Sequence, residues 1–235
     1  MFKRIYETKK LTAEALAEEI FQKFQAMERE IYIALSGGST PALLFSILAE
    51  NYSKSIRFDK INLLWVDERS VSPEDDESNY KMTSRSLLDF INIPHSNIHR
   101  VHGENNTEQE AIRYSQIIKN KVPVENNLPV FDIILLGVGD DGHTASIFPD
   151  QMELLKSNKI CEKAVHPQSG QERVTLTGPV LNNGESVYFL VCGKSKSDII
   201  VKILNKDKSY PASYIENKKG NLFFYLDADA SANIE

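Results

Sequence analysis

The sequence predicts one doubly wound α/β domain that covers residues 1–235 and is built on a mostly parallel sheet. Short apolar runs alternate along the chain with stretches that have the periodicity of amphipathic helices. The apolar runs are nearly unbroken, as in strands that are buried on both faces of a parallel sheet. No internal repeat, low-complexity tract or linker rich in proline and glycine divides the chain, so we expect a single domain.

Helices are expected where apolar residues recur on one face, or where hydroxyl residues and proline follow a strand. In residues 12–29 the recurring apolar positions are Leu16, Ile20, Phe24 and Met27. Further helices are predicted from Thr40 onwards, from about Ser78 to Phe90, over Thr107–Val122 and over Ile199–Leu204. Threonine side chains accept hydrogen bonds from backbone N–H groups, so Thr12 and Thr40 are the predicted N-caps of the first two helices.

Six runs are predicted strands, namely Ile31–Leu35, Ile61–Val66, Phe131–Leu136, Arg173–Thr177, Ser186–Cys192 and Leu222–Leu226. The charged residues 67–69 directly follow the second run and are expected at the carboxyl edge of the sheet, either as a solvated turn or as part of a site. Residues 123–129 are expected as a loop, and the stretch between His143 and Glu172 is rich in turn-forming residues.

Composition limits the function classes. The chain has a net charge of −6 and 41% hydrophobic residues, which argues against a nucleic-acid binder with its basic stripe and requires local cations for any anionic ligand. Cys161 and Cys192 form no metal-binding motif and favour a reducing compartment. The N terminus does not resemble a signal peptide and no apolar stretch approaches about 18 residues. We therefore expect a cytoplasmic protein without membrane contact, either a monomer or a small homo-oligomer.

The residues that follow Phe131–Leu136 form the first candidate site. Gly139 and Gly142 permit tight turns and a close approach of the backbone to a ligand, and they flank Asp141 and neighbour His143. Ligands of open α/β sheets bind beyond the carboxyl ends of the strands, and a histidine there can transfer protons near neutral pH. The alternative is a glycine-rich turn with a solvated His143.

Residues 137–142 also match the dinucleotide-binding pattern G-x-G-x-x-G. That motif seats a pyrophosphate on N–H groups at the start of a helix. Here Asp140 and Asp141 would repel the pyrophosphate, and Pro149 leaves little room for a long helix. A dinucleotide site is therefore the weaker interpretation.

The turn after Ile31–Leu35 is the second candidate site, and it contains Gly37, Gly38, Ser39 and Thr40. Two glycines between a strand and the start of a helix offer free N–H donors and the positive end of the helix dipole, which suit a phosphate or a carboxylate. The alternative is a capped helix that binds nothing.

Cations lie at further strand ends. Arg69 follows Asp67 after the second run, Arg173 begins the fourth run, and the turn after the fifth run carries Lys194 and Lys196. Together with the glycine turn and the acid–histidine pair, these residues predict a site for a small phosphorylated molecule. The chain has no G-x-S-x-G nucleophile motif, so we predict proton transfer or water activation without a covalent intermediate.

Three histidines suggest a metal site at first sight. If this segment were helical, His95, His99 and His102 would lie on one face of the helix, as metal ligands often do. Pro94 and the β-like segment 98–101 argue against a helix here, so loop histidines are the preferred interpretation.

Several segments, in this order, resemble the 6-phosphogluconolactonase family: LSGGSTP, VDERSV followed by SNY, LGVGDDGHTASIFP, ERVTLTGPVLN, the GKSK turn, and YPAS with the closing LFFYLD. The similarity extends from about Leu35 to Asp227. It implies the three-layer α/β/α sandwich that is shared by glucosamine-6-phosphate deaminases and ribose-5-phosphate isomerases. It also implies hydrolysis of 6-phospho-D-glucono-1,5-lactone in the oxidative pentose phosphate pathway, without a metal or an organic cofactor.

The resemblance also implies roles for single residues. His143 would be the general base that activates water, and Asp141 would orient His143 or fix the local charges together with Arg69. Arg69 would alternatively contact the developing oxyanion. The implied phosphate ligands are Gly37, Gly38, Ser39, Thr40, Arg173 and Lys196, with Lys194 as the competing lysine, while Asp67, Gly139 and Gly142 would support the substrate or the loops.

Two positions depart from the family pattern, Ser72 in place of a proline and Gly178 in place of a leucine. A sugar-phosphate deaminase or isomerase of the same fold is one alternative function, but its chemistry needs a carboxylate base, and no glutamate follows His143 before Glu153. A non-catalytic sugar-phosphate sensor is the other alternative. No basic helix-turn-helix segment, which such a sensor would carry, is evident.

Overall fold

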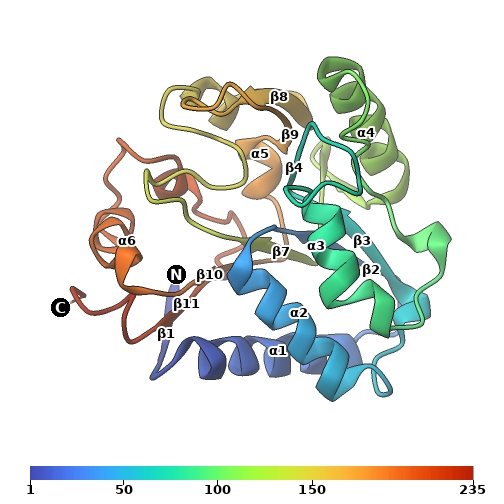
Figure 1. Ribbon diagram of the computed structural model, residues 1–235, viewed down its shortest axis with the longest axis horizontal. Coiled ribbons are helices and arrows are strands. Elements are labelled where there is room, and N and C mark those ends of the chain that lie inside the picture. The colour runs from blue at the N-terminus through green and yellow to red at the C-terminus, as the bar shows by residue number, and fades with distance from the viewer. Residues whose placement is uncertain (235) are drawn as a thin grey trace.

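A computed structural model describes residues 1–234 and has a six-stranded sheet as its central layer (Figure 1). The strand order is β1 (Phe2–Tyr6), β11 (Leu222–Asp227), β10 (Ser186–Val191), β7 (Ile133–Leu136), β2 (Ile31–Leu35) and β3 (Ile61–Trp65). All neighbouring strands of this sheet run parallel. The parallel sheet expected from the unbroken apolar runs is confirmed.

Helices cover both faces of this sheet. On one face lie α1 (Lys9–Ala26), α2 (Ser39–Tyr52) and α3 (Asn79–Ser86), and on the other lie α4 (Thr107–Lys121), α5 (Gly178–Leu181) and α6 (Ser197–Leu204). Because side chains alternate along a strand, Ile33 and Leu35 enter the first core whereas Tyr32 and Ala34 enter the second. The result is the three-layer α/β/α sandwich that the family resemblance implied.

A smaller antiparallel sheet packs against α4 on the second face. Its strand order is β4 (Asp67–Arg69), β9 (Glu172–Leu176) and β8 (Cys161–Val165). Val174 and Ala164 of this sheet join the same core as Ile118 of α4. A short hairpin, β5 (Val124–Glu125) with β6 (Leu128–Pro129), follows α4.

The order of the large sheet reverses between β2 and β7. From β2 the chain proceeds to β3 at one edge, and from β7 it proceeds to β10 and β11 on the other side. Such a switch point leaves a crevice at the carboxyl ends of its two central strands, where ligands of open α/β sheets bind. The Ser36 hydroxyl donates to the backbone oxygen of Leu135 at 2.8 Å, which ties the end of β2 to β7 at this point.

Both predicted helix caps are wrong. α1 begins at Lys9, and the side chain of Thr8 accepts from the Leu11 N–H at 3.2 Å, while Thr12 is buried within the helix. α2 begins at Ser39, and its N-cap is Gly38 at φ +107°, without a side-chain cap. Glycine adopts this left-handed conformation without steric cost. Gly38 can therefore be the N-cap, and the helix begins at Ser39, one residue before Thr40.

Several segments differ from the expected elements. β1 and β8 were not expected, β4 replaces an expected turn, and the hairpin β5–β6 replaces a loop. α3 ends at Ser86, and a separate 3₁₀ turn forms at Leu88–Phe90. At Gly178, a Cβ atom would lie 2.4 Å from the backbone oxygen of Leu155. This close approach explains why position 178 is a glycine, where the family pattern has a leucine.

The remaining motifs are also placed. No helix follows residues 137–142 before Pro149, so the G-x-G-x-x-G pattern lacks the helix start on which dinucleotide binding depends. His95 lies in a 3₁₀ turn, and Nε2 of His99 is 3.1 Å from Oδ1 of Asn62. Within residues 1–234 no group of three or more His, Cys, Asp or Glu side chains could hold a metal ion. In the same range, no helix has the length and apolarity needed to cross a membrane.

Candidate active site

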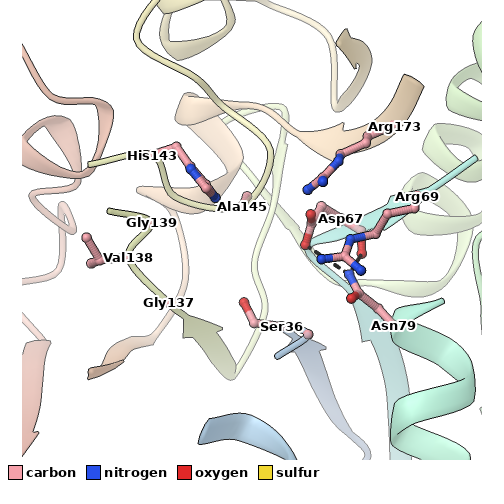
Figure 2. A pocket seen from close by; sticks show the side chains of 11 residues that line it. Ser36, Asp67, Arg69, Asn79, Gly137, Val138, Gly139, His143, Ala145 and Arg173 are labelled. Carbon is pink, nitrogen blue, oxygen red and sulfur yellow. Dashed lines mark hydrogen bonds between the residues drawn. The ribbon is translucent and has the colours of Figure 1, made fainter. Parts of the chain in front are cut away.

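A cleft of about 140 Å³ opens at the switch point between β2 and β7 (Figure 2). It is lined by Ser36, Gly37, Asp67, Arg69, Asn79, Gly137, Val138, Gly139, His143, Ala145 and Arg173. Figure 2 shows the ring of His143 on one side and the guanidinium groups of Arg69 and Arg173 on the other. The large sheet therefore supplies the imidazole, and the small sheet supplies the cations.

His143 is held by the loop that follows β7. Its Nδ1 atom lies 2.6 Å from Oδ1 of Asp141, and its backbone N–H donates to the same oxygen at 3.1 Å. The backbone N–H of Gly139 donates to the His143 carbonyl at 2.9 Å. A Cβ atom on Gly139 would lie 2.1 Å from His143 Nδ1, so only glycine leaves space for the ring at this position.

The Asp141 carboxylate fixes the tautomer of the ring. Burial tends to raise the pKa of Asp141, but the hydrogen bonds from the His143 ring and backbone outweigh it, and the pKa lies below its ordinary value. An ionised carboxylate only accepts hydrogen bonds, so Nδ1 of neutral His143 carries the proton and Nε2 has a free lone pair. A ring in this state can accept a proton from water.

Phe148 packs behind the imidazole. Its ring is fully buried, and its centroid lies 4.7 Å from that of His143. The Arg173 guanidinium lies over the same phenyl ring at 5.6 Å. This apolar side chain therefore positions both the base and one of the cations.

Glu68 positions Arg69 and the start of α3. Its buried carboxylate accepts from the backbone N–H groups of Arg69, Asn79 and Tyr80, each at 2.8 Å, and from the Ser78 hydroxyl at 3.0 Å. Burial raises the pKa of Glu68, although the three backbone donors oppose the shift. One carboxylate thus joins β4 to the helix that carries Asn79.

Asp67 lines the cleft next to Arg69. The Ser146 hydroxyl donates to its Oδ2 at 2.6 Å, and Nδ2 of Asn79 donates to its backbone oxygen at 2.9 Å. Nη1 of Arg173 lies 3.4 Å from the Ser146 oxygen. These contacts hold Asp67 and Arg173 of the small sheet in one network with the loop after β7 and with α3.

The glycine turn after β2 borders the cleft at Gly37. A Cβ atom on Gly37 would lie 1.8 Å from Oδ1 of Asn79. Gly38 and Ser39 are exposed, and Lys9 of α1 approaches the Ser39 hydroxyl at 3.4 Å. Because no side chain caps α2, the N–H groups of its first turn are available to an anion.

The lysine turn lies close to the histidine loop. Nζ of Lys196 is 2.5 Å from Oδ1 of Asp140, and its side chain is half-buried, whereas Lys194 is exposed. This difference favours Lys196 over Lys194 as the lysine of the site.

The cleft brings together six of the residues expected from sequence, namely Gly37, Asp67, Arg69, Gly139, His143 and Arg173. Gly38, Ser39, Thr40, Asp141, Gly142 and Lys196 do not line it, although Asp141 holds His143 directly. Sequence reasoning did not single out Ser36, Asn79 or Lys9. Asn79 lies in the SNY segment that carried part of the family resemblance, and that segment was the available signal.

The sequence from residue 7 to residue 224 matches the family model described as glucosamine-6-phosphate isomerases/6-phosphogluconolactonase. The chain belongs to this family. A member named 6-phosphogluconolactonase from Haemophilus influenzae is 39% identical over 226 residues, which cover 93% of this chain and 95% of that protein. A member with the same name from Treponema pallidum is 38% identical over 203 residues, with 86% and 84% covered.

Solved structures of the family have the same fold. A crystal structure described as devB protein is 40% identical with a TM-score of 0.95, and the match covers 100% of this chain and 99% of that chain. The 6-phosphogluconolactonase from Trypanosoma brucei is 25% identical with a TM-score of 0.89, and 100% and 98% of the two chains are covered. A monomeric glucosamine-6-phosphate deaminase shares the fold at a TM-score of 0.85 and 18% identity.

Proposed function

We propose that this protein is a 6-phosphogluconolactonase, which hydrolyses 6-phospho-D-glucono-1,5-lactone to 6-phosphogluconate in the oxidative branch of the pentose phosphate pathway. The observation that carries the proposal is the Asp141–His143 pair, whose Nε2 is free to accept a proton beside a cleft that also contains two arginines. The bacterial relatives that carry this name match nearly the whole chain. The two free cysteines agree with action in the cytoplasm.

His143 acts as the general base. Its Nε2 takes a proton from water as the water oxygen attacks the lactone carbonyl carbon, C1. The tetrahedral intermediate then collapses, the bond between C1 and the ring oxygen breaks, and His143 returns the proton to that oxygen. Asp141 stabilises the imidazolium that exists between the two transfers, and a base of this kind contributes about 10²–10⁴-fold to the rate.

The phosphate end of the substrate binds at the glycine turn. Gly37, Gly38, Ser39 and Thr40 offer backbone N–H groups and hydroxyls at the uncapped start of α2. Lys196, which contacts Asp140 of the histidine loop, adds a cation and exchanges Asp140 for the phosphate when substrate binds. No metal or organic cofactor takes part in the steps proposed here.

The deciding experiment compares wild type with His143→Ala on freshly generated lactone, with acid release followed by a pH indicator and the spontaneous rate subtracted. We expect a loss of about 10²–10⁴-fold in kcat. His95→Ala is the matched control, because His95 is an exposed histidine outside the cleft. Equal rates for wild type and His143→Ala would remove His143 as the base.

The deaminase alternative is tested in parallel. Among the described residues, Asp67 is the one carboxylate that lines the cleft, and the glutamate nearest in sequence after His143, Glu153, is exposed and does not line it. We expect no ammonium release from glucosamine 6-phosphate. Rapid release, without lactone hydrolysis, would replace the proposed function by the deaminase reaction.

A further inference from the structure

Two arginines are brought together by strand pairing. In the antiparallel pair β4–β9, Arg69 lies directly opposite Arg173. Cross-strand partners project from the same face of a sheet, and both side chains line the cleft. Figure 2 shows both guanidinium groups on the side of the cleft opposite His143, with Asp67 drawn between them.

Neither arginine has a carboxylate partner among the residues that the structure describes. Within residues 1–234, no carboxylate oxygen lies within 4.0 Å of a nitrogen of either side chain, although the protein carries a net charge of −6. Arg69 donates through Nη1 to the backbone oxygen of Glu77, and Arg173 donates to the side chains of Ser146 and Gln171. All three acceptors are uncharged.

Both side chains also retain an unused donor. The Nε atoms of Arg69 and Arg173 are buried and have no hydrogen-bond partner in the part of the chain that the structure describes, and Arg173 is only 9% exposed. Burial lowers the pKa of Arg173, the charge of Asp67 opposes this shift, and the nearby charge of Arg69 adds to it. Two arginines that line one cleft, each with a buried unused N–H donor and neither with a carboxylate partner among the described residues, are a site for an anion.

We propose that Arg69 and Arg173 form a second anion site, which binds the C1 oxygen of the substrate as it becomes an oxyanion and then the carboxylate of the product. This proposal rests on the proposed function. It assigns Arg173 to C1 in place of the phosphate role implied by the family resemblance, and leaves the phosphate to the glycine turn and Lys196.

The position of Arg173 relative to the base supports this assignment. Phe148 contacts both the His143 ring, at 4.7 Å between centroids, and the Arg173 guanidinium, at 5.6 Å from its own centroid. The water that His143 activates must attack C1, and the two arginines line the same cleft as His143, so they can meet the oxygen on C1. The lactone carbonyl is neutral, whereas the intermediate and the ionised product carry a negative charge there, so the arginines favour the later states.

The test uses two ligands that differ only at C1, namely 6-phosphogluconate, with a carboxylate, and glucitol 6-phosphate, with a hydroxymethyl group. Calorimetry measures both with wild type, Arg173→Gln and Lys196→Met. We expect Arg173→Gln to weaken binding of 6-phosphogluconate by about 10- to 100-fold and to leave glucitol 6-phosphate unchanged. Lys196→Met should weaken both ligands to the same extent.

Kinetics give a second readout. Arg173→Gln should lower kcat more than it raises KM, and Lys196→Met should do the reverse. Arg69→Gln, at a less buried position, should repeat the pattern of Arg173→Gln if the latter variant does not fold. Equal weakening of both ligands by Arg173→Gln would place Arg173 at the phosphate and overturn the proposal.

The two proposals fail separately. If wild type does not hydrolyse the lactone, the proposed function is wrong, while the ligand pair still decides whether the arginines recognise a carboxylate. If wild type hydrolyses the lactone and Arg173→Gln binds both ligands as wild type does, the second anion site alone is wrong.

Discussion

Asp141 acts on the candidate base through a single oxygen atom. Oδ1 receives both the ring and the backbone N–H of His143, and the pKa of the carboxyl lies below its ordinary value. A carboxyl whose pKa is lower in the folded state stabilises that state above its unfolded pKa. This contribution is lost as the pH falls through the lowered value.

Asp141→Asn tests this contribution. We expect the variant to be less stable than wild type at pH 7, because the amide replaces an ionised acceptor, and the two to converge as the pH falls below about 3.8. Urea denaturation at pH 7, 5 and 3 measures the difference. Asp150→Asn, an exposed control, should follow wild type throughout. A difference for Asp141→Asn that persists unchanged at pH 3 would contradict the assignment.

At the scale of single residues, the sequence predicted which side chains carry the chemistry. It did not predict which of them contact one another. His143, Asp141 and Arg69 could be found because each follows a strand that is apolar along its length. Asn79 could not, because it reaches the cleft from the start of α3, and its place depends on the buried Glu68. The pairing of Arg69 with Arg173 joins two segments far apart in the chain, and no local pattern encodes such a register.

At the scale of elements, the small sheet was the least predictable part of the fold. β4 consists of three charged residues, and it forms a strand because donors from other elements satisfy Asp67 and Glu68. β8 contains Glu162 and Lys163 at half-buried positions. β1 is an edge strand with mostly exposed residues. None of these three has the unbroken apolar run that identifies a central strand.

Glu68→Gln tests the junction of β4 and α3. The amide group of glutamine would face one or more of the N–H donors that now point at the carboxylate, and an unsatisfied buried donor costs about 1–3 kcal/mol. We expect a loss of this size in the free energy of unfolding, measured by urea denaturation. Glu74→Gln, at an exposed acid in the loop between β4 and α3, should have no effect. Equal stability of the two variants would show that Glu68 does not hold the junction.

At the scale of the whole molecule, a buried contact holds α1 against the large sheet. It lies on the face of the large sheet that is opposite to the small antiparallel sheet. Glu19 accepts from the Tyr188 hydroxyl at 2.6 Å and from the Tyr225 hydroxyl. Burial raises the pKa of both tyrosines, and the hydrogen bond to Glu19 raises it further. The three residues belong to α1, β10 and β11, and none of them lines the cleft.

Glu19→Ala should therefore separate stability from activity. We expect the free energy of unfolding to fall by about 1–3 kcal/mol, since two buried hydroxyls lose their acceptor, with kcat unchanged at temperatures where the protein is folded. Thermal unfolding and the lactone assay measure the two quantities. Glu14→Ala on the same helix is the control. A large loss of kcat without a loss of stability would connect this contact to the site.

Arg69 and Arg173 are cross-strand partners, and this pairing limits the segments of the chain in which residues can be inserted or deleted. Side chains alternate between the two faces of a strand, so one residue inserted into or deleted from β4 or β9 would turn one guanidinium to the opposite face of the small sheet. Insertions in the exposed stretch 72–77 between β4 and α3 would leave this pairing intact. We therefore expect active enzymes with this arginine pair to differ in length only in their loops. The numbers of residues in β4 and β9 should stay the same.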